Sequence, residues 1–468
     1  MNTLEIAWRN VRRNGRRSLL TALALAVGTL AILMFGGYVN DNVQGLQTAT
    51  VRTYGHLQVV PKDFLDFGRG NPGRFSIKAY EALVERIRAD AVLSPMLAVV
   101  TPVLEVEGMA GNFASGVSSN FVGEGVVPEE RRRQLSWDGF DIGIPPGQTV
   151  LSSDMPAAGV VGLRMAQLLS LCDALQISNC RRLQLDDAAV APQGAPQALP
   201  ADIAALAAGT QGQAVAAPAG AVSIELLASS PGGMPNVVRM DVLKAERQGI
   251  RQIDSMYVAL PLPLAQRLVF GPERRAVSSI VVQLRQTAQI DAAQARLEEI
   301  VRTAGQSLEV LTFRDVSPVY DQIVATYTTI FQFIAWLMAA ITLFSITNAV
   351  NMAVSERTGE IGTLRSLGFQ RSTIGRIFIS EGAVLGVLGT LGGALLALVL
   401  AEGVINLAGL SWTPPGRSSA IPIRVDILSS PSLVLFTVLG LSAVACLSAL
   451  WPASKAARLE ITDALRQA

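Results

Sequence analysis

Four long runs without a charged residue constrain this chain more than any other feature. They cover residues 18–40, 322–355, 382–401 and 427–454. A helix needs about 20 predominantly apolar residues to cross the hydrocarbon layer of a bilayer. All four runs reach that length, so the sequence predicts four transmembrane helices. Buried core helices of a soluble protein are the alternative, but only 16% of the residues are charged, below the roughly 25% of ordinary soluble domains.

The run 18–40 has a second interpretation, because the basic stretch RRNGRR precedes it as in a signal peptide. Its apolar part is longer than the about 7–15 residues of a signal-peptide core, which favours an uncleaved anchor. The preceding residues 1–17 have an amphipathic pattern, with Trp8 among the apolar side chains and arginines elsewhere. We expect a surface helix in the headgroup zone of the membrane; the alternative is that these arginines only set the orientation.

Basic residues predict how the helices are oriented. They gather before the first run, between the second and third runs, and after the last run: Arg9, Arg12, Arg13, Arg16, Arg17, Arg357, Arg365, Arg371, Arg376, Lys455, Arg458 and Arg466. An even number of spans separates these three places, so they share one side of the membrane, which the positive-inside rule makes cytoplasmic. The block 41–321 and the connection 407–430 are then expected on the outer side.

The outer block has the pattern of a mixed α+β domain. Runs rich in β-branched residues, such as LAVVTPVLEVEGM, alternate with helical patterns such as SIKAYEALVERIRAD, for which Ser76 is the expected N-cap. The stretch 187–221 is rich in Ala, Pro, Gly and Gln, and we interpret it as a surface excursion. Cys172 and Cys180 precede it and are candidates for a disulfide on an oxidising side; two unpaired thiols are the alternative.

One charged segment, 355–375, lies between the second and third apolar runs. Ile361, Leu364 and Leu367 recur every three residues there, which predicts one apolar face of a short helix. Charged residues flank that face: Glu356, Arg357, Glu360 and Arg365. An apolar ridge with a charged rim is typical of a helix that fills a partner's groove; the alternative is a solvated loop.

Two glycine pairs with four-residue spacing lie in the third run: Gly382 with Gly386, and Gly389 with Gly393. This spacing lets helix backbones approach closely in lipid, either against other spans of the same chain, which we favour, or against a partner. Glu381 and Glu402 bracket the run near the two interfaces, where snorkelling or capping accounts for a carboxylate; a role in transport is the alternative.

The sequence lacks a G-x-x-x-x-G-K-[ST] loop, so we expect no ATP binding by that route. A single histidine, His56, and the lack of a dense cluster of ligands leave no metal site to predict. A formal net charge of +1 implies no nucleic-acid partner. We expect no cofactor and no catalysis in this chain, so any work it performs must be powered by another chain.

Three stretches carry a resemblance to a known family. EIAWRNVRRNGRRSLLTALALAVG, ERTGEIGTLRSLGFQRSTIGRIFISEGAVLGVLGTLGG and WPASKAARLEITDAL resemble the amino-terminal, central and carboxy-terminal parts of MacB/FtsX-type ABC transporter permeases, which include the Lol-type lipoprotein-releasing permeases. The resemblance implies an α-helical membrane domain of four transmembrane helices, plus a mixed α+β extracytoplasmic domain inserted between helices 1 and 2. It also identifies the segment 355–375 as the coupling helix that docks on the ATPase.

In chain order the predicted parts are a cytoplasmic surface helix (1–17), transmembrane helix 1 (18–40), a periplasmic α+β domain (41–321), a stalk with transmembrane helix 2 (322–354), the coupling segment (355–375), transmembrane helix 3 (376–406), a periplasmic loop (407–430), transmembrane helix 4 (431–452) and a cytoplasmic tail (453–468). The second uncharged run exceeds what a bilayer needs by roughly 20 Å of helix, so it either tilts or continues outside as the stalk.

The resemblance implies partners as well as a fold. They are two copies of a separate ABC ATPase, which binds ATP and Mg, a second permease copy or a sister permease, membrane lipid, and an optional periplasmic adaptor or substrate protein. The expected location is the bacterial inner membrane. The implied function is export or extraction of a lipoprotein, peptide or small molecule from the periplasmic side; the alternative is a signal relay that controls a cell-wall hydrolase. An insertion between VVGLRMAQLL and VSIELLAS, which includes Cys172 and Cys180, departs from the family pattern.

Overall fold

The structure, a computed structural model, describes residues 3–68, 71, 74–113, 115–141, 147, 149–177, 180, 222–231, 233–272, 274–413, 415 and 420–458. Two compact units make up the chain. One comprises Met1–Leu46, Val319–Trp412 and Ile421–Ala468, and the other comprises Gln47–Pro318 and Thr413–Ala420. The predicted excursion 187–221 and the end of the predicted tail, 459–468, lie outside the described residues.

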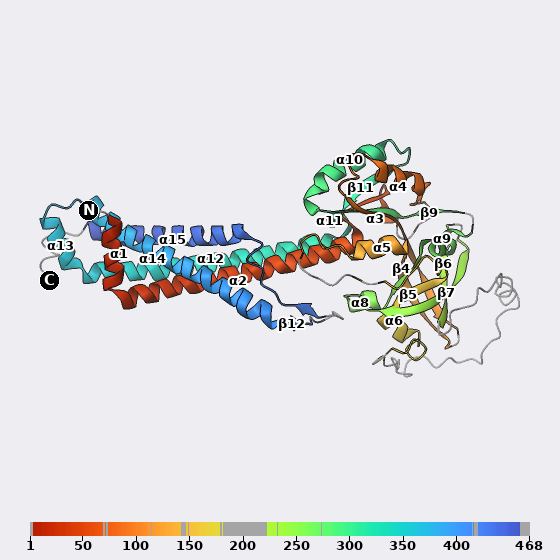
Figure 1. Cartoon of the computed structure of the whole chain (residues 1–468), viewed down its shortest axis with the longest axis horizontal. Helices are drawn as coiled ribbons and strands as arrows, with labels where there is room; N and C mark the ends of the chain where they lie inside the picture. The colour runs from red at the N-terminus through yellow and green to blue at the C-terminus, as the bar shows by residue number, and fades with distance from the viewer. Residues whose placement is uncertain are drawn as a thin grey trace. The chain divides into compact units, whose positions relative to one another are not determined.

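Long helices dominate the first unit (Figure 1). They are α1 (Thr3–Arg13), α2 (Gly15–Tyr54), α12 (Pro318–Glu356), α13 (Thr358–Ser366), α14 (Arg371–Leu400) with the π-helical turn η2 (Ala401–Asn406), and α15 (Pro431–Ala457); β12 (Ser411–Trp412) pairs with β13 (Ile421–Pro422). Four of the described helices, α2, α12, α14 with η2, and α15, are long and apolar enough to cross a membrane. Helix α2 continues from the end of its uncharged run at Asn40 to Tyr54, because no proline interrupts these residues.

Glycines on α14 bring three helices into close contact. A Cβ atom at Gly382 or Gly386 would lie 2.8 or 2.7 Å from the Cβ atoms of Ala449 and Ala445 on α15. Farther along, a Cβ atom at Gly393 would lie only 2.4 Å from the backbone oxygen of Ala26 on α2. The two glycine pairs therefore contact two different helices of this chain, as small residues do between helices in lipid.

A nine-stranded mixed sheet is the frame of the α/β unit. Its order is β11-β1-β10-β3-β4-β8-β5-β7-β6. The strands are β1 (Leu57–Pro61), β3 (Leu97–Asn112), β4 (Val117–Val126), β5 (Ala158–Gly162), β6 (Val222–Ser229), β7 (Pro235–Glu246), β8 (Tyr257–Pro261), β10 (Ser279–Leu284) and β11 (Leu308–Thr312). Strand β6 also pairs with β3, where Leu227 faces Met109, so six strands close into a ring: β3, β4, β8, β5, β7 and β6.

Shorter elements complete this unit: α3 (Phe64–Phe67), β2 (Ile77–Lys78), α4 (Tyr80–Ala89), α5 (Pro128–Leu135), α6 (Leu163–Leu168), α8 (Arg251–Asp254), α9 (Leu262–Phe270), β9 (Ala276–Val277), η1 (Thr287–Gln289), α10 (Ile290–Arg302) and α11 (Phe313–Val316). The helix predicted to begin after Ser76 begins only at Tyr80, with Ala79 at the N-cap position. That prediction was wrong because Ile77 and Lys78 pair with β9 as a short strand.

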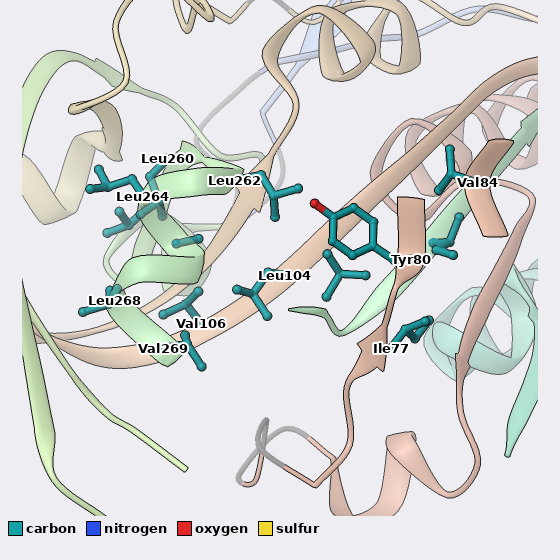
Figure 2. Close-up of a cluster of buried hydrophobic side chains, with 14 of the residues drawn as sticks. Ile77, Tyr80, Val84, Leu104, Val106, Leu260, Leu262, Leu264, Leu268 and Val269 are labelled. Atoms are coloured by element: carbon teal, nitrogen blue, oxygen red, sulfur yellow. The ribbon is translucent and has the colours of Figure 1, made fainter. Parts of the chain in front are cut away.

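Strand β3 belongs to two parts of the sheet. Its first half pairs with β10, and its second half, from Leu104 to Asn112, pairs with β4 in the ring. Leu104, Val106 and Ala110 are buried while Glu107 between them is exposed, which is the period-two pattern of a strand with one covered face. Figure 2 shows side chains of α9 and of the Ile77–Val84 region gathered around this strand.

The carbonyl end of α2 is capped by side chains of the α/β unit. The last carbonyls of a helix have no partner within the helix and need one from elsewhere. Gln283 Nε2 donates to Val51 O at 3.4 Å, Gln134 Nε2 donates to Thr53 O at 3.2 Å, and Gln58 Nε2 donates to Tyr54 O at 2.8 Å. Elsewhere in the α/β unit, Cys172 and Cys180 form a disulfide.

His56 follows this helix end and is completely buried. Its Nδ1 accepts a hydrogen bond from Leu284 N at 3.0 Å, so Nε2 carries the proton and lies 3.1 Å from Thr287 Oγ1. The Trp137 and His56 rings pack in a T-shaped arrangement, with the ring centroids 4.9 Å apart. Burial lowers the pKa of His56 to about 4, so the native state holds this side chain neutral.

The glycine contacts predict that adding a side chain to α14 lowers the stability of the protein at some glycine positions and not at others. Gly393→Val should lower the stability of the full-length protein by about 1–3 kcal/mol, because the new side chain must displace the α2 backbone. Gly392→Val is the matched control, since a Cβ there meets nothing within 4 Å. Thermal unfolding of both variants in detergent tests this; equal melting temperatures would contradict the packing.

His56 predicts a pH dependence of stability. Between pH 6.5, the ordinary pKa of histidine, and about 4, the unfolded chain binds a proton that the native state does not. The free energy of unfolding should therefore fall as the pH falls through this window, by roughly 3 kcal/mol in total. His56→Asn keeps an acceptor for Leu284 N but does not titrate, so the difference between wild type and variant should shrink towards acid pH. A difference that is constant from pH 7 to 4 would refute the prediction.

Candidate functional site

Helix α13 is a short helix with defined ends between two of the long helices. It begins after Arg357, which follows the last residue of α12, and ends at Ser366. The C-terminal stop depends on Gly368, whose φ of +92° lies in the left-handed region that favours glycine. Phe369 N donates to Leu364 O and Gly368 N donates to Arg365 O, both at 3.1 Å, which is the Schellman pattern of a helix terminus.

The three apolar residues of the predicted ridge differ in exposure. Ile361 is 3% exposed and packs into a cluster with Val354 and Ile374, whereas Leu364 is half-buried and Leu367 is 72% exposed. Within this chain Ile361 belongs to the core, so the three residues of the predicted ridge do not share one exposed face. A step of three residues falls short of a full helical turn of about 3.6 residues, so these side chains rotate progressively from the core towards the surface.

Two of the predicted rim charges pair with arginines near the amino terminus. Glu360 Oε1 lies 2.7 Å from Arg13 Nη2, and Glu356 pairs with Arg17. The side chains in both pairs are about half exposed. Sequence reasoning missed these partners, although Arg13 with Arg17 and Glu356 with Glu360 have the same four-residue spacing.

The third rim charge is buried. Arg357 Nη1 lies 3.3 Å from Glu381 Oε2 on α14, and the two side chains are only 8% and 7% exposed. Removing one member of a buried ion pair leaves an unpaired charge and typically costs about 3–5 kcal/mol. Glu381, which was expected near an interface, is thus paired inside the unit with the N-cap residue of α13.

Arg365 completes the predicted rim, and its Nε is buried without a hydrogen-bond partner among the described residues. The apolar surface that the rest of the unit leaves open on α13 is at its carboxy-terminal end, where Leu364 is half-buried and the following Leu367 is exposed.

Another concavity lies between α2, α12 and α15, with a volume of about 680 Å³. Its walls are mainly apolar, as at Ile32, Phe331 and Leu433, with Asn40 and Gln332 among the polar exceptions. In the part of the chain that the structure describes, no group of three or more His, Cys, Asp or Glu side chains could hold a metal ion.

The buried pair predicts that Glu381→Gln destabilises the full-length protein by about 3 kcal/mol, because the Arg357 charge loses its counter-ion. Glu402→Gln is the control, since Glu402 is exposed and bonds to Asn406 within one turn. The double variant Arg357→Met/Glu381→Leu, which removes both charges, should recover most of the loss. Melting temperatures report this, and a Glu381→Gln protein as stable as Glu402→Gln would contradict the pairing.

Comparison with known proteins identifies relatives of this region. Residues 332–461, which include α13, match the FtsX-like permease C-terminal family. The ABC transporter permease YtrF of Bacillus subtilis (strain 168) is 32% identical over 141 residues, which cover 29% of this chain and 31% of YtrF. The macrolide export ATP-binding/permease protein MacB of Bdellovibrio bacteriovorus is 27% identical over 220 residues, covering 45% of this chain and 31% of MacB.

A third relative is the lipoprotein-releasing system transmembrane protein LolC of Xylella fastidiosa (strain Temecula1), 28% identical over 137 residues, which cover 28% of this chain and 33% of LolC. The matches thus span about a third of the length of each of these relatives. With its long apolar helices the chain is a membrane protein, and its matched part is similar to ABC transporter permeases of the FtsX, MacB and Lol types.

Proposed function

We propose that this chain is the permease subunit of an ATP-driven ABC transporter that transmits motion of cytoplasmic ATPases to a domain on the other side of the membrane. ATP hydrolysis is assigned to a separate partner chain, present in two copies, and the permease pairs with a second copy or a sister permease. The observation that carries the proposal is α13, which lies inside the matched region 332–461 and presents an open apolar end.

The proposed topology puts the α/β unit outside the cytoplasm, inserted between the first and second transmembrane helices. Two observations support this. Basic residues concentrate at the opposite ends of the helices, as the positive-inside rule requires for the cytoplasmic side. The disulfide between Cys172 and Cys180 lies in the α/β unit, and such bonds persist in oxidising compartments such as the periplasm. The bacterial inner membrane is the corresponding location.

Docking on the ATPase is assigned to the carboxy-terminal end of α13, with Leu364 and Leu367 as apolar contacts and Arg365 beside them. This revises the site expected from sequence, because Ile361, Glu356, Arg357 and Glu360 are engaged within the chain. Their role is to hold α13, while an exposed leucine such as Leu367 gains by entering a partner's groove.

The substrate is extracted or exported from the outer side, and its class is a lipoprotein, a peptide or a small molecule. The relatives' names support two of these: MacB is named for macrolide export and LolC for lipoprotein release. A signal relay to a periplasmic cell-wall hydrolase is the alternative function, since it needs the same transmission and no substrate path.

Leu367→Asp should abolish stimulation of the partner ATPase without changing membrane insertion or melting temperature, because the side chain is exposed and makes little contact within the chain. Ile361→Asp should instead destabilise the protein, since it puts a charge into the core. ATP hydrolysis by the co-purified complex is the measurement. Wild-type stimulation in both Leu367→Asp and Leu364→Asp would defeat the assignment of α13.

A further inference from the structure

We propose that Arg13 and Arg17 are positioning residues that set where α13 lies, through paired contacts with Glu360 and Glu356. The importance of this for coupling rests on the proposed function, whereas the positioning itself is a property of this chain alone. The basic stretch RRNGRR would then do more than orient the first helix in the membrane.

Two ion pairs join the junction between α1 and α2 to the junction between α12 and α13. Arg13 is the last residue of α1 and Arg17 lies in the first turn of α2, while Glu356 ends α12 and Glu360 lies in the first turn of α13. Arg13 Nη2 lies 2.7 Å from Glu360 Oε1, and Arg17 Nη1 donates to Glu356 Oε2. The two arginines lie on either side of the α1–α2 junction, and the two glutamates lie on either side of the α12–α13 junction, so the two ion pairs connect these junctions.

The basic side of this contact is held in place by packing. Ala7 and Val11 on α1 are buried, and α1 packs against α14. Asn14 N donates to Asn10 O, and Arg17 N donates to Asn14 O, so α1 passes into α2 through a hydrogen-bonded turn at Asn14 rather than a loose linker. Arg13 and Arg17 therefore present their guanidinium groups from a fixed element.

The neighbouring arginines provide the contrast. Arg12 and Arg16 are exposed and form no ion pair with any described residue, although they have the same four-residue spacing. All four charges serve membrane orientation equally under the positive-inside rule. Membrane orientation therefore does not explain why only two of the four arginines form ion pairs, and this points to a second role for Arg13 and Arg17.

The solvent exposure of these pairs indicates an adjustable contact. Exposed ion pairs are weak and screened by salt, in contrast to the buried pair of Arg357 with Glu381. Each exposed pair is expected to bias the position of α13 by about two- to fivefold in population. The buried pair fixes the start of α13, and the exposed pairs favour one of the orientations that this fixed point allows.

The test uses the full-length chain with spin labels on α1 and α13, at Asn10→Cys and Thr363→Cys, in a Cys446→Ser background. Removing two charges by Arg13→Gln/Arg17→Gln should broaden or shift the distance distribution between the labels. Arg12→Gln/Arg16→Gln removes the same charge from adjacent positions and should leave the distribution unchanged. Exchange of all four charges, Arg13→Glu/Arg17→Glu with Glu356→Arg/Glu360→Arg, should restore the wild-type distribution.

Two further readouts separate this inference from the proposed function. Raising the salt to about 1 M, where the Debye length is about 3 Å, should reproduce the effect of Arg13→Gln/Arg17→Gln in wild type and add nothing in that variant. ATPase stimulation by the complex should fall about two- to fivefold in Arg13→Gln/Arg17→Gln only. A changed distance with unchanged stimulation would support the positioning and contradict the coupling role. An unchanged distance in Arg13→Gln/Arg17→Gln would overturn the inference.

Discussion

The ion pair between Arg357 and Glu381 is the interaction on which the proposed site depends. A buried charge is tolerated only with a partner, so the start of α13 and the inner part of α14 must stay together. The same helix α14 is held by glycine contacts to α15 and α2, which leave no room for a side chain. In the proposed function, these contacts connect α13 to α14 and, through α14, to α15 and α2.

The two ends of α13 therefore differ: its amino-terminal end packs within the chain, and its carboxy-terminal end offers an apolar contact to a partner. Ile361 and the charges at its first turn belong to the chain's own packing, while Leu367 at the other end is exposed. Helix α13 is a single helix of nine residues that ends before Gly368, so one regular element joins its two ends. In the proposed function, ATPase motion enters at the leucines and leaves through α12 and α14.

Sequence patterns predicted the elements better than their contacts. The four apolar runs identified the four long helices, because length and lack of charge are local properties of the sequence. The prediction of Ser76 as an N-cap was wrong, because the pairing of Ile77 with β9 joins segments that are far apart in the sequence. Likewise, the recurrence of apolar residues predicted a ridge but not the gradient of burial from Ile361 to Leu367. The partners of Glu356 and Glu360 lie near the opposite end of the sequence, so only the fold reveals them.

The central claim is that α13 and the α/β unit lie on opposite sides of the membrane. Single cysteines at two exposed positions, Leu367→Cys and Val237→Cys, in a Cys446→Ser background allow a direct test with a membrane-impermeant maleimide. Spheroplasts should label Val237→Cys only, and inverted inner-membrane vesicles should label Leu367→Cys only. Labelling of both positions from the same side would contradict transmission across the membrane.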